Sequence, residues 1–162
     1  MSIFFSIREV VEMAISTERS GQIFYQTASK QAREKSLKEL FRYLAEEEAK
    51  HLKTFQGFYN ALKERPETTP YNWEEAKLYL EALVSSRFFS TPDKAINLAR
   101  EAKNEIEAID SAINFEKETL LFFYETVELV KSQNRDLIKS VIKEEKKHIR
   151  RLFTLKDKLS KS

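Results

Sequence analysis

The sequence contains no cysteine, only two glycines, three prolines and two histidines among its 162 residues. The absence of cysteine excludes disulfides, thiolate zinc sites, iron–sulfur clusters and cysteine nucleophiles from this chain. Histidine and carboxylate chemistry is left open. Any redox function of these residues must therefore depend on ligands of those two kinds.

Charge of one sign and long apolar runs are also missing. Basic and acidic residues nearly cancel to a net charge of +2, and they are interleaved, so no nucleic-acid footprint stands out. The N-terminal apolar run is too short for a secretory signal, and no stretch approaches the roughly 20 apolar residues of a membrane span. We expect a soluble cytoplasmic protein without nucleic-acid or membrane partners.

The scarcity of glycine and proline favours long helices. All three prolines, Pro66, Pro70 and Pro92, lie in the middle third, so helices can run uninterrupted on either side. A chain of this length buries about 70% of its unfolded surface when it folds, which suits one domain over residues 1–162. The sequence thus predicts a single all-α domain.

Four segments have apolar residues spaced alternately three and four apart, which is the pattern of an amphipathic helix. One stripe consists of Leu37, Phe41, Leu44, Glu48, His51, Phe55, Phe58 and Leu62. The other three pass through Glu18, through Glu116, and through Glu145 and His148. Each stripe therefore carries a carboxylate at mid-length on the face that points to the core.

The connections predict two helix pairs. Short turns are expected at Arg33–Ser36 and Ser132–Asn134, whereas residues 65 to about 104 are too many for a turn and must cross over between the pairs. In this crossover a helical pattern runs from Asn72 to about Val84, and Thr91-Pro92 is typical of an N-cap followed by proline at the first helical position. We expect one or two accessory helices there.

An internal repeat supports this layout. The spacing Glu48-x-x-His51 recurs as Glu145-x-x-His148, at an offset of 97 residues. The run Ala14-Ile15-x-x-Glu18 recurs as Ala112-Ile113-x-x-Glu116, at an offset of 98 residues. We infer that one helix-pair unit is used twice.

The repeated polar positions predict a metal site. A Glu-x-x-His spacing alone is weak evidence, because residues three apart share a helix face and often form only a surface hydrogen bond. Here four carboxylates and two imidazoles would lie at one level of a core, where an uncompensated charge costs several kcal/mol. No lysine or arginine occupies a matching stripe position, and two divalent ions would balance four glutamates. The predicted ligands are Glu18, Glu48, His51, Glu116, Glu145 and His148; satisfied core polar groups are the alternative.

Residues next to the predicted ligands receive a different interpretation. Glu46, Glu47 and Glu144 are predicted to be solvated helix surface, with a supporting role behind the ligands as the alternative. Tyr25 lies one stripe step from Glu18, and either hydrogen-bonds a ligand carboxylate or packs in the core.

With these residues the sequence resembles the ferritin-like superfamily, and within it the rubrerythrin-like branch. The superfamily site takes one glutamate from each of two helices and a Glu-x-x-His from each of the other two. Glu18 through Tyr25 and Glu116 through Phe123 resemble the first and third helices of the family, and Glu48–His51 and Glu145–His148 resemble the second and fourth. The resemblance implies a ferritin-like four-helix bundle.

The resemblance also implies a site and a reaction. It implies two iron ions, with manganese or a mixed pair equally suited to the ligand types. Glu48 and Glu145 would bridge the ions, Glu18 and Glu116 would be terminal ligands, and each histidine would hold one ion. The implied activity is an oxidoreductase that reduces hydrogen peroxide, or less readily oxygen. A homodimer is also implied.

Two departures from the family pattern matter. Rubrerythrins proper carry a four-cysteine rubredoxin module, which this chain cannot supply, so a separate donor such as a rubredoxin-type protein would deliver the electrons. Rubrerythrins also tend to place a further glutamate three residues after the third-helix ligand, where this chain has Thr119. The expected site is therefore more symmetric and lacks the basis for redox-linked iron movement.

Three other functions stay open on the sequence alone. Iron oxidation for storage, as in ferritins, needs a hollow multi-subunit shell. A di-iron oxygenase needs a cavity beside the metals. A metal-free helical interaction module, in which the polar layer only fixes helix register, predicts that Glu48→Ala with His51→Leu raises thermal stability.

Overall fold

The computed structural model describes residues 7–64, 73–85 and 91–162, and every regular element in them is helical. The helices are α1 (Ile7–Gln31), α2 (Lys35–Glu64), α3 (Trp73–Val84), α4 (Pro92–Glu101), α5 (Glu105–Leu129) and α6 (Ser132–Ser160). The described helices include none that is both long enough and apolar enough to cross a membrane. The remaining parts of the predicted crossover, residues 65–72 and 86–90, lie outside the described residues.

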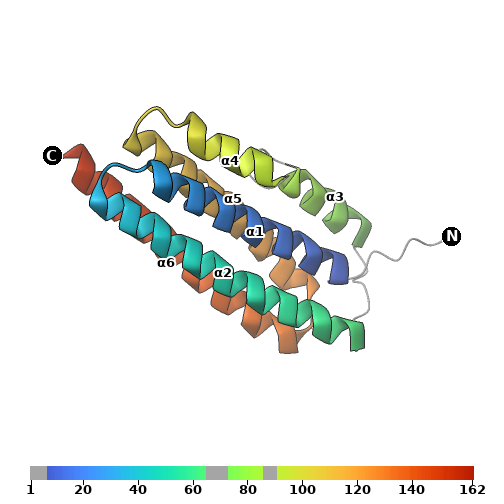
Figure 1. Ribbon diagram of the computed structural model, residues 1–162. Coiled ribbons are helices and arrows are strands. Elements are labelled where there is room, and N and C mark those ends of the chain that lie inside the picture. The colour runs from blue at the N-terminus through green and yellow to red at the C-terminus, as the bar shows by residue number, and fades with distance from the viewer. Residues whose placement is uncertain (1–6, 65–72, 86–90) are drawn as a thin grey trace.

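The four long helices form a bundle of two pairs. Helix α1 packs against α2 and α5 packs against α6, and the two pairs lie together (Figure 1). Helices α3 and α4 run along the side of α1 and α5, away from α2 and α6 (Figure 1). The predicted ferritin-like bundle with accessory helices in the crossover is confirmed.

The helix ends show where local sequence signals succeed. Thr91 caps α4, because its side-chain oxygen accepts a hydrogen bond from the Lys94 amide at 3.2 Å, and Pro92 follows in the first turn. The turn predicted at Ser132–Asn134 is wrong, since α6 already begins at Ser132. A short polar run of serine, glutamine and asparagine suits the first turn of a helix as well as a loop.

The turn between α1 and α2 is held from another helix. Glu105, at the start of α5, places Oε1 2.6 Å from the amide nitrogen of Arg33 and 2.9 Å from that of Glu34. These amides precede α2, where donors have no partner within the helix. The carboxylate thus fixes the beginning of α2 relative to α5.

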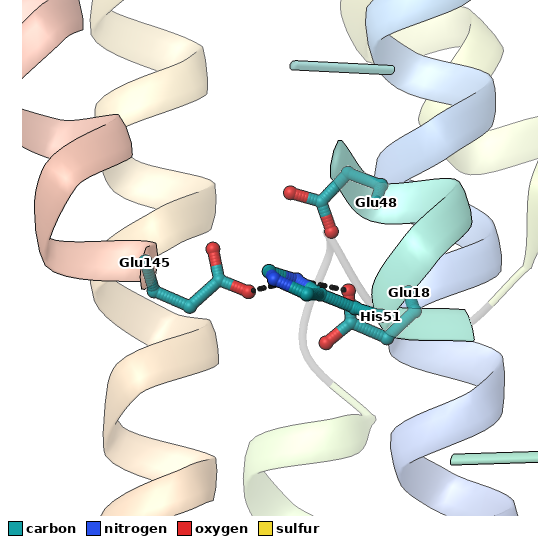
Figure 2. Close-up of side chains that lie close together, drawn as sticks. All are labelled: Glu18, Glu48, His51 and Glu145. Atoms are coloured by element: carbon teal, nitrogen blue, oxygen red, sulfur yellow. Dashed lines mark ion pairs between the residues drawn. The ribbon is translucent and has the colours of Figure 1, made fainter. Parts of the chain in front are cut away.

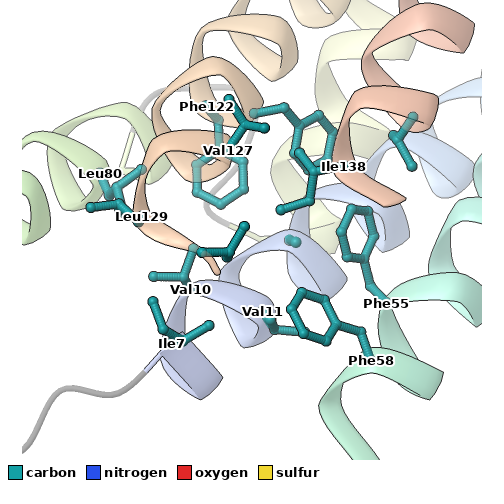
Figure 3. Close-up of a cluster of buried hydrophobic side chains, with 14 of the residues drawn as sticks. Ile7, Val10, Val11, Phe55, Phe58, Leu80, Phe122, Val127, Leu129 and Ile138 are labelled. Atoms are coloured by element: carbon teal, nitrogen blue, oxygen red, sulfur yellow. The ribbon is translucent and has the colours of Figure 1, made fainter. Parts of the chain in front are cut away.

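The apolar core is divided into two clusters, one toward each end of the bundle. The first contains Val10, Phe55, Leu80, Phe122 and Ile138 (Figure 3), and the second contains Phe24, Phe41, Leu98, Ile109 and Leu152. Both draw side chains from all four bundle helices. Because neighbouring helices in each pair are antiparallel, their midpoints meet at one level between the clusters. The buried polar side chains lie in that layer.

Candidate metal centre

The bundle brings all six sequence-predicted ligands together. One glutamate comes from α1 and one from α5, whereas α2 and α6 each contribute a glutamate and a histidine three residues apart. The six are Glu18, Glu48, His51, Glu116, Glu145 and His148, and each is at most 2% exposed. The three-residue spacing places each Glu and His pair on one helix face, which here faces the bundle axis.

The six side chains form two overlapping groups that could each hold a metal ion. Glu18, Glu48, His51 and Glu145 make up the first group, and Glu48, Glu116, Glu145 and His148 make up the second. In each group one ligand atom per residue lies within 4.8 Å of the others. Glu48 and Glu145 belong to both groups. The geometry therefore matches two metal positions that share a pair of carboxylates.

Both imidazoles turn Nδ1 toward the shared carboxylates. His51 Nδ1 lies 2.9 Å from Glu145 Oε1 and 3.5 Å from Glu18 Oε2, so the ring stands between the two carboxylates (Figure 2). His148 Nδ1 lies 2.8 Å from Glu145 Oε2 and 3.5 Å from oxygens of Glu48 and Glu116. Metal–ligand bonds of about 2.1 Å at right angles place neighbouring ligand atoms about 3 Å apart. The observed separations are of this size.

Many of these inward atoms lack hydrogen bonds. Both oxygens of Glu18, Glu48 and Glu145 are buried without a hydrogen-bond partner, and so is Nδ1 of each histidine. The ion pairs that the structure describes for the four carboxylates are all with the two histidines. Unpaired buried polar groups are costly, and converging lone pairs are what a metal ion satisfies. Donors of this type and arrangement fit a pair of divalent ions.

The electrostatics show how the cluster behaves without a metal. Burial raises the pKa of Glu18, and the charge of Glu48 raises it further. Burial and the charge of Glu145 likewise raise the pKa of Glu116, to about 8. Ionised carboxylates so close together repel one another. Without metal, Glu18 and Glu116 therefore retain protons at pH values where free glutamate is ionised.

The histidines and Glu145 respond in the opposite sense. Burial alone would lower the pKa of His51, but the nearby carboxylates of Glu18 and Glu145 outweigh burial and raise it. The pKa of His148 is likewise raised by its carboxylate neighbours, although burial alone would lower it. Burial favours the neutral form of Glu145, yet both histidines outweigh burial and lower its pKa. Without metal, the protonated imidazoles supply the positive charge that metal ions would otherwise bring.

Tyr25 both packs in the core and touches the site. Its ring is fully buried and lies 5.8 Å from the ring of Phe41, centroid to centroid. Its hydroxyl donates a hydrogen bond to Glu116 Oε1. Burial and the charge of Glu116 raise the pKa of Tyr25, so the phenol keeps its proton and remains a donor. Tyr25 therefore orients one carboxylate of the cluster.

Thr119 occupies the position where the family resemblance suggests a further glutamate. It is fully buried, and its hydroxyl donates to the backbone carbonyl of Phe115 at 3.0 Å. This is the common local hydrogen bond of a helical threonine to the residue four before it. Thr119 thus contributes no carboxylate to the site.

For Glu144 the structure shows the alternative interpretation, a supporting role behind a predicted ligand, rather than the favoured one. The prediction placed it on the solvated surface, but its Oε2 lies 2.7 Å from Nε2 of His51 and its side chain is only 40% exposed. The contact crosses from α6 to α2, so spacing along a single helix gives no sign of it. Of the other two flanking residues, Glu46 is exposed and Glu47 pairs with Lys50 at 2.5 Å.

Comparison with known proteins agrees with the fold and the site. The sequence model of the Rubrerythrin family matches residues 9–156, which include all six residues of the cluster. Searches among curated proteins and among solved structures gave no match. The family match, the helical bundle and the buried layer of glutamates and histidines are mutually consistent, and the chain belongs to the rubrerythrin family.

Proposed function

We propose that this chain is a non-haem di-iron oxidoreductase that reduces hydrogen peroxide to water with electrons from a separate donor protein. The observation that carries the proposal is the pair of overlapping ligand groups that share Glu48 and Glu145. Two ions held by shared carboxylates lie close enough to act on one small molecule. Membership of the rubrerythrin family supports redox chemistry in general.

The two overlapping groups support a division of ligand roles in this proposal. Glu48 and Glu145 would hold both ions, because each belongs to both ligand groups. Glu18 and Glu116 each belong to one group and would hold one ion. Each histidine would hold one ion through Nδ1, the nitrogen that faces the carboxylates.

The chain positions and shields the reacting centre. Two ferrous ions, when bound, supply one electron each, so that hydrogen peroxide, two electrons and two protons give two water molecules. The protein keeps bulk water away, since every ligand side chain is at most 2% exposed. Tyr25 holds the Glu116 carboxylate in one orientation through its hydroxyl hydrogen bond.

The electrons must come from outside these 162 residues. The sequence has no cysteine and therefore cannot form a rubredoxin-type iron site. We assign the supply of electrons to a separate one-electron donor protein, of which a rubredoxin-type protein is the expected example.

Anaerobic loading with Fe(II), followed by mixing with hydrogen peroxide or with oxygen, tests the proposal. We expect two irons per chain and a faster rise of visible absorbance with peroxide than with oxygen at equal concentration. Faster oxidation by oxygen would favour storage or oxygenase chemistry, and light scattering would then identify a multi-subunit shell. Absence of bound iron would rule out the di-iron assignment.

Variants connect the reaction to the cluster. Glu48→Ala with His51→Leu removes one shared carboxylate and one imidazole, so iron binding should fall to background. Glu46→Ala, at an exposed position five residues before His51, is the matched control and should keep two irons and the wild-type rates. Equal iron content in both variants would place the metal elsewhere.

A further inference from the structure

The two histidines of the cluster differ in what stands behind them. His51 Nε2, the nitrogen on the far side of the ring from the carboxylate cluster, contacts Glu144 Oε2 at 2.7 Å. His148 Nε2 is buried and, among the residues that the structure describes, has no hydrogen-bond partner. An imidazole that binds metal through Nδ1 carries its proton on Nε2 and needs an acceptor there. Within the described part of the chain, His51 has such an acceptor and His148 does not.

The repeat shows that this difference is not a missing residue. The offset of 97 that relates Glu48 to Glu145 also relates Glu47 to Glu144, so a glutamate stands at the same place in both units. Glu47 is nevertheless turned to Lys50, with Oε1 2.5 Å from its Nζ. The carboxylate that would serve His148 is therefore paired within its own helix.

The neighbouring charges explain why the two glutamates behave differently. Lys50 pairs with Glu47, and the carboxylate of Glu46 adds negative charge near its ammonium. At the same offset of 97, Lys147 has Lys143 in the place of Glu46. Among the described residues, Glu144 pairs with His51 across the bundle and forms no ion pair with Lys147. Glu144 is thus left for His51.

We propose that the two metal positions have unequal affinity, with Glu144 as a positioning residue that makes the His51 position fill before the His148 position. The inference rests on the proposed dinuclear centre. Glu144 fixes the tautomer and orientation of the His51 ring. It also makes Nδ1 more basic and therefore a better ligand to the metal. At the other position, the buried N–H of His148 finds no acceptor among the described residues, so metal binding there is weaker.

Titration of the metal-free protein with Mn(II), followed by calorimetry and electron paramagnetic resonance, tests this order of filling. We expect two binding steps, and at one equivalent a spectrum of isolated Mn(II) rather than of coupled pairs. His51→Ala should remove the tighter step and His148→Ala the weaker one. Two equal steps in the wild type would overturn the inference but leave the dinuclear centre intact, whereas no binding would overturn both.

Glu144→Ala and Glu47→Ala form the matched pair that isolates the positioning role. Loss of a partner behind a ligating histidine typically weakens metal binding about 10- to 100-fold. We expect Glu144→Ala to weaken the first step by this factor and leave the second unchanged, and Glu144→Gln, which keeps an acceptor oxygen, to restore most of it. Glu47→Ala should change neither step. Equal weakening of both steps by Glu144→Ala would indicate a structural role and overturn the proposal.

Discussion

At the scale of single residues, the site depends on a glycine, because a side chain at that position would collide with its neighbours. Gly21 lies in α1 next to the cluster, and a Cβ atom there would stand 2.8 Å from two ring atoms of Phe115 and 3.2 Å from Glu48 Oε2. The Phe115 ring is stacked with Phe24 and meets Tyr25 edge-on, so it has little room to move. The glycine is therefore required by close approach.

We predict that Gly21→Ala lowers the free energy of unfolding of the metal-free protein by about 1–3 kcal/mol, the usual cost of overpacking a core. It should also reduce bound Mn(II), because Glu48 must shift. Gly57→Ala is the control, since a Cβ atom at Gly57 of α2 meets nothing within 4 Å. That change should stabilise by about 0.5–1 kcal/mol. Urea unfolding of both variants measures the difference, and a stabilised Gly21→Ala would contradict the packing described.

Residue types and spacing predicted the buried cluster but not its surroundings. Glu48 and Glu145 interrupt apolar stripes, so their burial follows from helical periodicity within one helix. Glu144 precedes Glu145 by one residue, and nothing in its own helix distinguishes it from a solvated glutamate. Its contact with His51 depends on the distance and rotation of α6 relative to α2. Such contacts are fixed only when helices pack.

At the scale of helices, the bounds followed the sequence where a cap residue had a unique role. Thr91 with Pro92 fixed the start of α4, whereas the polar residues from Ser132 to Asn134 were compatible with a loop or a first turn. The start of α2 is different again, because the carboxylate of Glu105 that accepts its amides comes from α5. No local pattern predicts a cap supplied by a distant helix.

We predict that Glu105→Ala lowers the free energy of unfolding by about 1–2 kcal/mol, because two backbone amides lose their acceptor. The amide protons of Arg33 and Glu34 should then exchange faster with solvent, which hydrogen–deuterium exchange measures. Glu39→Ala is a suitable control: Glu39 is 62% exposed and pairs with Lys35 only at 3.9 Å. Its effect should stay within about 0.5 kcal/mol. Equal effects would show that the cap contributes nothing.

At the scale of the whole molecule, the polar layer makes stability depend on pH. Burial raises the pKa of Glu116 to about 8, so between pH 4.5 and 8 the folded chain holds a proton that the unfolded chain has lost. Stability therefore falls as pH rises through this window. The raised pKa values of His51 and His148 act in the same direction above 6.5, the value of free histidine.

We predict that the metal-free protein loses stability from pH 5 to pH 8, by up to about 1.4 kcal/mol per pH unit for each proton involved. Metal binding displaces these protons, so the stabilisation by Mn(II) should grow over the same range. Metal at 100 times its dissociation constant contributes about 2.7 kcal/mol. Anaerobic urea unfolding at pH 5, 6, 7 and 8, with chelator or with Mn(II), measures both trends. Metal-free stability that rises with pH would contradict the electrostatics of the cluster.

The sharing of Glu48 and Glu145 between both ligand groups has a consequence for the ancestry of the chain. Neither helix pair holds a full set of ligands, because each group takes residues from both pairs. A half-length ancestor could have built this centre only by pairing with a second copy of itself, and such a pair would have had two identical halves. Joining the copies into one polypeptide released each half to mutate separately. The difference between Glu46 and Lys143, which occupy equivalent places in the two halves, is of the kind that only the fused gene permits.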